Sequence, residues 1–377
     1  MRKLNHIIFL LITLLLSSCI SQFVPQVEEA KELLVVQGLI TDQHETDTVR
    51  LSRSQPLGEA ASAIPVGRCN VSISDNLGNV VYLTETQPGT YITPSSFYGE
   101  AGRFYTLHIA TGAELGNFTY ESTPCELVPV PPIDSVYYEK VVIEKPVGFY
   151  KGIDACQIKL DTYDPENKCK YYRWNFSETW IFRLLFDVPN QTCWIKDKSH
   201  SINIKSTVAF DRALIKGYPI NYITNITDRL KTRYSILVNQ YSMNADEYSY
   251  WEKIQNIAVQ VGGLYDIIPT SVPSNLFCVE NPSEKVLGYF SVSAKKSKRL
   301  FISDTFNGII DRYNKCITDT VFNPNFPGVN VNAWILFSHI LSIPQVSFYE
   351  ITTDHGCADC TLRGTTVRPD FWIDANK

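Results

Sequence analysis

Short β-rich segments separated by turn residues fill residues 33–128 and leave few folds open to this part of the chain. Val71 and Ile73 alternate with serines, a pattern that gives a strand one buried and one solvated face. Seven such segments in about 90 residues predict an immunoglobulin-like β-sandwich. They are Leu33–Ile40, Thr48–Ser52, Cys69–Ser74, Val80–Thr84, Thr90–Thr93, Phe104–Ala110 and Asn117–Glu121.

A proline-rich segment gives the clearest domain boundary. Residues 129–132 read Pro-Val-Pro-Pro, and proline has no backbone N–H to donate to a sheet. We therefore expect an extended linker at 129–135. The remaining residues, 136–377, are again mostly strand-like and predict a larger β-rich domain. The predicted fold class is thus mainly β.

One segment of the second domain has a helical pattern instead. Asn244 is a suitable N-cap, and Asp246 and Glu247 suit the positive end of a helix dipole. The pair Gly262-Gly263 is expected to end this single clear helix. Its apolar stripe consists of Tyr248, Trp251, Ile254 and Ala258.

The composition excludes several classes of protein. Hydrophobic residues make up 44% of the chain and aromatic residues 12%, too many for a disordered or coiled-coil protein. The 39 acidic residues outnumber the 34 Lys and Arg residues, for a formal net charge of −5. A nucleic acid is therefore not an expected partner.

The first residues look like an export signal. Arg2 and Lys3 precede an apolar run at 7–16, which is shorter than a membrane-spanning helix. The next residues, Leu-Ser-Ser-Cys ending at Cys19, resemble a bacterial lipobox. We expect a lipoprotein signal peptide at 1–18, lipid attachment at Cys19 and a tether at 19–32; several acyl chains make such an anchor effectively permanent. The alternative is an ordinary secretory signal with a chance cysteine.

Cysteines in an exported chain are expected to form disulfides. Cys357 and Cys360 form a CxxC motif, with His355 close by. A structural disulfide is the favoured interpretation, and a metal site or a redox centre are the alternatives. A zinc site needs four ligands, and this stretch offers at most three.

Two further groups of residues are candidate binding sites. Asp161, Asp164 and Glu166 offer hard oxygen ligands that suit calcium, although a turn before Pro165 explains the same residues. The strand-like stretch at 171–183 is the richest in aromatic residues. Its Arg173, Trp174 and Trp180 are either core residues or part of a binding surface.

The order of several motifs resembles one family over essentially the whole mature chain. The motifs are residues 66–75, 131–135, 233–242, 250–251, 262–266, 281–282, 286–290, 357–361 and 368–372. The family is that of the Bacteroidota outer-membrane lipoproteins catalogued as domain of unknown function 4249. The resemblance implies a lipid-anchored outer-membrane protein, often encoded beside a SusC-like TonB-dependent transporter, and it supplies no catalytic residues.

The expected function follows from these observations together. The sequence has no GxSxG, HExxH, Walker or GxGxxG motif, which disfavours an enzyme. We expect a non-enzymatic accessory or ligand-binding partner of a TonB-dependent transporter at the outer membrane, with no cofactor besides its lipid. A surface hydrolase of glycans or peptides, with carboxylates from separate strands, is one alternative. An adhesion or envelope-scaffold protein is another.

Overall fold

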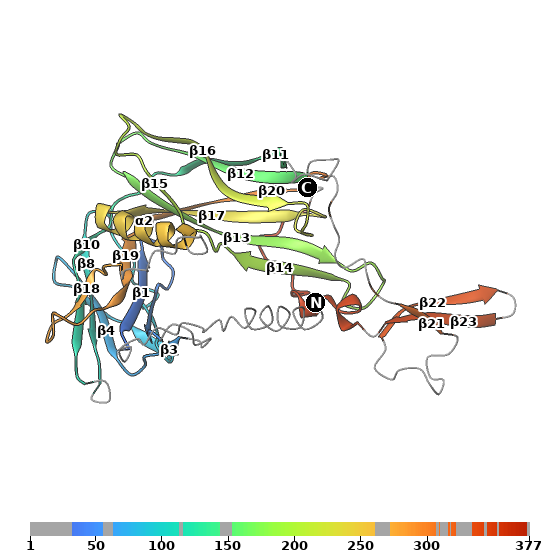
Figure 1. The fold of residues 1–377 in the computed structure, drawn as a ribbon, viewed down its shortest axis with the longest axis horizontal. Helices are drawn as coiled ribbons and strands as arrows, with labels where there is room; N and C mark the ends of the chain where they lie inside the picture. Colours follow the sequence, from blue (N-terminus) through green and yellow to red (C-terminus); the bar gives the residue numbers. More distant parts are fainter. Residues whose placement is uncertain are drawn as a thin grey trace, which may run out of the picture.

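The computed structural model describes residues 32–55, 63–112, 116–143, 153–260, 272–306, 309, 316, 318–321, 334–342, 345–352 and 354–374. The fold is mainly β, as predicted, and consists of two β-sandwiches and a smaller three-stranded sheet (Figure 1). The predicted signal peptide, Cys19 and the predicted helix stop at Gly262-Gly263 lie outside the described residues. No helix in the described ranges is long and apolar enough to cross a membrane.

The first sandwich consists of two six-stranded sheets. One has the order β19 (Leu287–Ser293), β1 (Leu34–Thr41), β2 (Thr48–Arg53), β7 (Thr90–Ile92) and β6 (Thr84–Gln87), with β3 (Ile64–Pro65) beside β2. The other has the order β18 (Leu276–Cys278), β9 (Thr119–Ser122), β8 (Phe104–Ala110), β4 (Asn70–Asp75) and β5 (Val80–Tyr82), with β10 (Cys125–Glu126) beside β8. The alternating residues Val71 and Ile73 are buried between the sheets.

The interval 33–128 does not contain the whole first sandwich. Strand β18 pairs with β9, and β19 pairs with β1 in parallel, so residues 276–293 complete both sheets. The close approach of β19 to β1 depends on Gly288, which has a φ of 89°. A Cβ atom there would lie 1.9 Å from the carbonyl oxygen of Val36.

The second sandwich follows the proline-rich segment. A three-stranded sheet, β11 (Ile133–Ile143), β12 (Ile153–Asp164) and β16 (Ala213–Thr224), packs on a five-stranded sheet. The latter has the order β14 (Thr192–Lys198), β13 (Tyr171–Arg183), β17 (Tyr234–Met243) and β20 (Lys295–Ile302), with β15 (Asn203–Ser206) beside β13. Because β11 begins at Ile133, the last residues of the predicted linker 129–135 belong to a strand.

The two sandwiches share one run of strand. Only Ala294 separates β19 of the first sandwich from β20 of the second. In the described residues the chain passes from the first sandwich to the second before β11 and at Ala294. These passages fix the sandwiches relative to each other, and Figure 1 shows helix α2 (Ala245–Gln260) at their junction.

The helix begins where the sequence predicts. The side-chain oxygen of Asn244 accepts a hydrogen bond from the backbone N–H of Glu247 at 2.8 Å, which is the expected N-cap. The predicted apolar stripe is only half-buried at Tyr248, Trp251 and Ile254 and is exposed at Ala258. The residue of this helix that is almost fully buried is Glu247.

The small sheet contains β21 (Asp319–Val321), β23 (Gln345–Thr352) and β22 (Trp334–Ser342). It extends away from both sandwiches at the right of Figure 1. Two short 3-10 helices, η3 (His355–Cys357) and η4 (Cys360–Leu362), then bring the chain back to β14. There Trp372 contacts the rings of Trp194 and Phe301.

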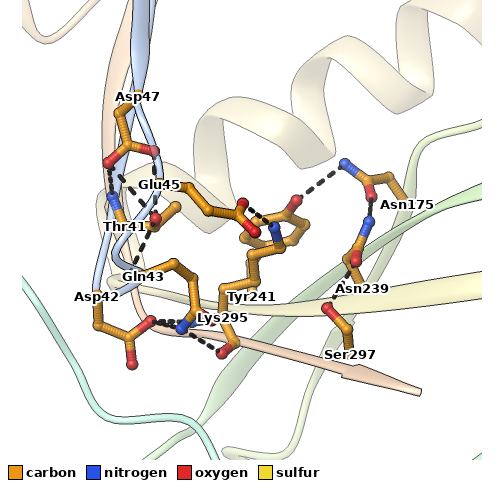
Figure 2. Close-up of polar contacts among 10 residues, drawn as sticks. All are labelled: Thr41, Asp42, Gln43, Glu45, Asp47, Asn175, Asn239, Tyr241, Lys295 and Ser297. Atoms are coloured by element: carbon orange, nitrogen blue, oxygen red, sulfur yellow. Dashed lines mark hydrogen bonds and ion pairs between the residues drawn. The ribbon is translucent and has the colours of Figure 1, made fainter. Parts of the chain in front are cut away.

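The turn between β1 and β2 connects the first sandwich to β20. As Figure 2 shows, Asp42 accepts hydrogen bonds from the backbone N–H of Lys295 at 2.8 Å and from the amide of Gln43 at 2.6 Å. At the end of the turn, Asp47 is buried and accepts a hydrogen bond from the backbone N–H of Thr41 at 2.6 Å. Burial raises the pKa of Asp47 to about 6, although the hydrogen bonds from Thr41 oppose this shift.

We expect Asp47 to make the protein less stable as the pH rises. The unfolded chain releases this proton near the ordinary Asp pKa, whereas the native carboxyl retains it up to about pH 6. The favourable contribution of Asp47 to the free energy of unfolding is therefore complete at low pH and is lost as the pH rises through 6. The free energy of unfolding of Asp47→Asn, minus that of the wild type, should increase by about 2 kcal/mol between about pH 4 and pH 7. Urea titrations followed by tryptophan fluorescence measure it. A difference that does not change with pH would contradict the assignment.

Candidate functional site

One face of the five-stranded sheet carries a row of polar side chains. Asn175 of β13, Asn239 of β17 and Ser297 of β20 lie side by side in the strand register. Ser297 donates to the Asn239 oxygen at 2.7 Å, and the Asn239 amide donates to the Asn175 oxygen at 2.8 Å. The Asn175 amide extends the row to the Tyr241 hydroxyl at 3.4 Å, as seen in Figure 2. Each amide is thereby held in one orientation.

Arg173 lies next to this row and is the least satisfied polar residue near it. Its guanidinium lies between two aromatic rings, 5.1 Å from the centre of the Tyr241 ring and 4.9 Å from that of Trp251. The Nε and Nη2 atoms are buried, yet they have no hydrogen-bond partner among the described residues. Buried donors of a charged group are costly to leave unpaired, so a position of this kind suits a ligand that supplies acceptors.

Glu247 is the counter-charge to Arg173 in the first turn of α2. Its carboxylate lies 3.9 Å from Nη2 of Arg173, and it accepts hydrogen bonds from Ser291 at 2.7 Å and from the Trp251 indole at 3.2 Å. Burial raises the pKa of Glu247, and Arg173 offsets part of that rise. The carboxylate therefore positions Trp251 and Arg173 without satisfying the donors of the guanidinium.

Two cavities adjoin Arg173 and Trp251, which line both of them. The first has a volume of about 530 Å³ and lies over the polar row of the five-stranded sheet. The second, of about 480 Å³, lies between α2 and the β1–β2–β19 region of the first sandwich. Both volumes are in the range of small-molecule sites.

The linings of these cavities carry positive charge. Lys198 joins Arg173 at the first cavity, and Arg50 joins it at the second. Neither lining includes an Asp or Glu residue, although the chain as a whole is acidic. The arrangement favours the binding of an anion, and it offers no carboxylate pair for acid–base chemistry within the cavities.

Of the three residues proposed as a binding surface, Arg173 lines both cavities and has unpaired donors. Trp174 borders only the first cavity, and Trp180 borders neither. Trp174 is 1% exposed and packs between the sheets, where its indole donates to Gln240 at 2.9 Å. Trp180 is 6% exposed and lies under the Arg229 guanidinium. Alternate residues of a strand point to opposite faces, so both tryptophans are on the core side.

The three proposed calcium ligands have protein partners instead. The Asp161 carboxylate accepts from the backbone N–H of Gly217 at 2.7 Å, and that of Asp164 accepts from the N–H of Cys169 at 2.7 Å. Glu166 pairs with Lys168 on the surface. Within the described ranges no group of three or more His, Cys, Asp or Glu residues is placed to hold a metal ion.

The two cysteines of the CxxC motif form disulfides, but not with each other. Cys357 bonds to Cys316, and Cys360 bonds to Cys193 of β14. Both sulfurs are thus committed to partners far away in sequence, and the motif connects the C-terminal segment to the sheet. Cys69, Cys125, Cys156, Cys169 and Cys278 are free thiols, and burial raises the pKa of each.

Several residues of this site were not identified from the sequence. Asn175 lies on the opposite strand face from Trp174, and its alternation with aromatic residues was a usable signal for a polar face. Asn239 and Lys198 are recognisable only through their pairing with β13. Glu247 was assigned to the helix dipole, and nothing in the sequence indicates its burial.

Comparison with known proteins supports the family to which the sequence motifs point. A search of curated proteins found no match. The family model described as domain of unknown function 4249 matches residues 20–299, which are 280 of the 377 residues. The match includes β1, β13, β17 and α2, and hence both cavities. The chain therefore belongs to the family described as domain of unknown function 4249.

Proposed function

We propose that this chain is a lipid-anchored outer-membrane protein that binds a ligand at the junction of its two sandwiches and works beside a SusC-like TonB-dependent transporter. The observation that carries the ligand-binding part is the Arg173 guanidinium, whose buried donors lack partners at the wall of two cavities. The lipobox-like sequence ending at Cys19 and the family resemblance support the location and the partner.

The mechanism would be capture at a surface. A lipid at Cys19 confines the protein to the membrane, and confinement raises the effective concentration of a bound ligand near the transporter, so that a modest affinity suffices. The shared β19–β20 run holds the cavities in a fixed relation to the first sandwich. Such rigidity lowers the entropy lost when a ligand binds.

The test is recovery of the lipidated full-length chain from its native outer membrane in mild detergent, followed by mass spectrometry of the proteins that accompany it. We expect a TonB-dependent transporter in stoichiometric amount. The Cys19→Ala variant is the control, and it should leave the membrane fraction and lose the transporter. Recovery of the lipoprotein without any transporter would contradict a stable complex.

A further inference from the structure

The first cavity has a lining that suits one chemical class of ligand. Amide and hydroxyl side chains dominate it: Asn175, Asn203, Asn239, Ser177, Ser199 and Ser201. Each amide offers both donors and acceptors, and each hydroxyl can act as either. A ligand that is itself rich in hydroxyl groups can exchange hydrogen bonds with many of these groups at once. The second cavity differs, because Val35, Leu39, Ile254 and two tyrosines contribute to its wall.

The Trp251 ring gives the first cavity an aromatic wall. The face of an indole packs well against the C–H groups of a pyranose ring. The hydrogen bond from the Trp251 indole to Glu247 fixes the orientation of this ring before any ligand arrives. A polyhydroxylated ring is therefore favoured over an extended apolar ligand.

The charge of the lining adds a second requirement. The ionisable residues of the lining are Arg173, Lys198 and His200, and the lining contains no Asp or Glu. Glu247 does not line the cavity, and Ser291 and Trp251 already donate to it. A planar guanidinium whose Nε and Nη2 atoms have no hydrogen-bond partner matches the two oxygens of a carboxylate or sulfate. A neutral saccharide offers these donors only uncharged oxygen acceptors, and such hydrogen bonds are weaker than those to a carboxylate or sulfate.

We propose that the first cavity binds an anionic saccharide, with one carboxylate or sulfate group on Arg173, a further anionic group toward Lys198 and a ring on Trp251. This inference rests on the proposed ligand-binding function and names the class of ligand. Because Arg173 is held between two rings and beside Glu247, the cation is in position before the ligand binds. Lys198 is exposed on β14 and supplies the second charge at the rim.

The experiment is isothermal titration of the purified full-length protein in detergent with four probes of equal length. These are an oligogalacturonide, a sulfated oligosaccharide, a neutral cello-oligosaccharide and an oligoglutamate peptide. We expect the acidic or the sulfated saccharide to bind, and the neutral one to bind at least about tenfold more weakly, since a hydrogen bond between charged groups is at stake. The comparison of the first two probes identifies which anion is preferred.

Variants then locate the binding site. Lys198→Gln should weaken binding of the charged saccharide by about tenfold, and Arg173→Gln by more. Lys196→Gln is the matched control, because Lys196 lies on the same strand and face but does not line the cavity. Arg50→Gln tests the second cavity, and it should weaken binding less than Lys198→Gln does. Arg173→Gln leaves Glu247 without its counter-charge, and this variant can therefore misfold. In that case the affinity of the Lys198→Gln variant is the test, because Lys198 is exposed.

Three results would overturn the inference: equal affinity for the neutral saccharide, stronger binding of the oligoglutamate peptide, or a larger loss in Arg50→Gln than in Lys198→Gln. Equal binding of a neutral saccharide, lost only in Trp251→Ala, would overturn the anion requirement and leave the proposed function standing. Binding of the charged saccharide without recovery of a transporter would support the inference and contradict the proposed partnership.

Discussion

Trp174→Ala is expected to lower the free energy of unfolding by about 3–5 kcal/mol, the usual cost of removing a large aromatic core side chain. The Trp174 side chain is buried and its ring lies 5.8 Å from that of Tyr172 and 4.5 Å from that of Tyr218, between centres. Its removal leaves a cavity between the two sheets and deprives Gln240 of a donor. Urea unfolding measured by circular dichroism gives the difference.

The matched control for this prediction is Trp251→Ala. Trp251 is half-buried at the cavity wall, so its loss should cost less stability and more ligand affinity. The two tryptophans thus separate a core role from a binding role. If the free energy of unfolding of Trp174→Ala is within about 1 kcal/mol of that of the wild type, the core assignment is wrong, because buried large-to-small changes cost more than that.

Loss of the Cys193–Cys360 disulfide is expected to have an effect of similar size. The bond joins residues 167 apart in sequence, and constraining so long a loop in the unfolded chain stabilises the folded state by up to about 5 kcal/mol. It also holds the C-terminal segment, including Trp372, on the sheet. The double variant Cys193→Ala/Cys360→Ala should therefore unfold at clearly lower urea concentration.

The second disulfide provides a comparison within the same molecule. Cys316 and Cys357 are only 41 residues apart, so removing their bond should cost less, up to about 4 kcal/mol in the same treatment. Cys69→Ala, which removes a free thiol, serves as the control for handling of cysteine variants. Equal unfolding free energies for the oxidised wild type and the Cys193/Cys360 double variant would contradict the prediction.

Local patterns were sufficient to predict much of the fold. The alternation at Val71 and Ile73 and the cap at Asn244 each act over a few residues, and the structure agrees with both. The pairing of β1 with β19 could not be predicted in this way. It joins residues some 250 positions apart, and a strand pattern indicates which face is buried but not which strand is the neighbour.

The candidate site, too, could be predicted from local sequence patterns only in part. The residues 171–183 were recognised as a strand, and its alternation separates Arg173 from Trp174. Which of the two faces meets the other sheet depends on β12 and β16, and these strands belong to a sheet that does not pair with β13. The partners of Cys357 and Cys360 were likewise beyond local reasoning, because proximity in sequence favours neither Cys316 nor Cys193.

The parallel pairing of β1 with β19 also determines how the molecule bears a mechanical load. A pull on the chain before β1, resisted at β20, draws the two paired strands in opposite directions along their length. Seven residue pairs, from Val35 with Leu287 to Thr41 with Ser293, then resist together in shear. An antiparallel hairpin pulled from its open end would instead separate one pair at a time. The first sandwich would therefore remain folded under forces, applied at the amino end of β1, that unzip a hairpin.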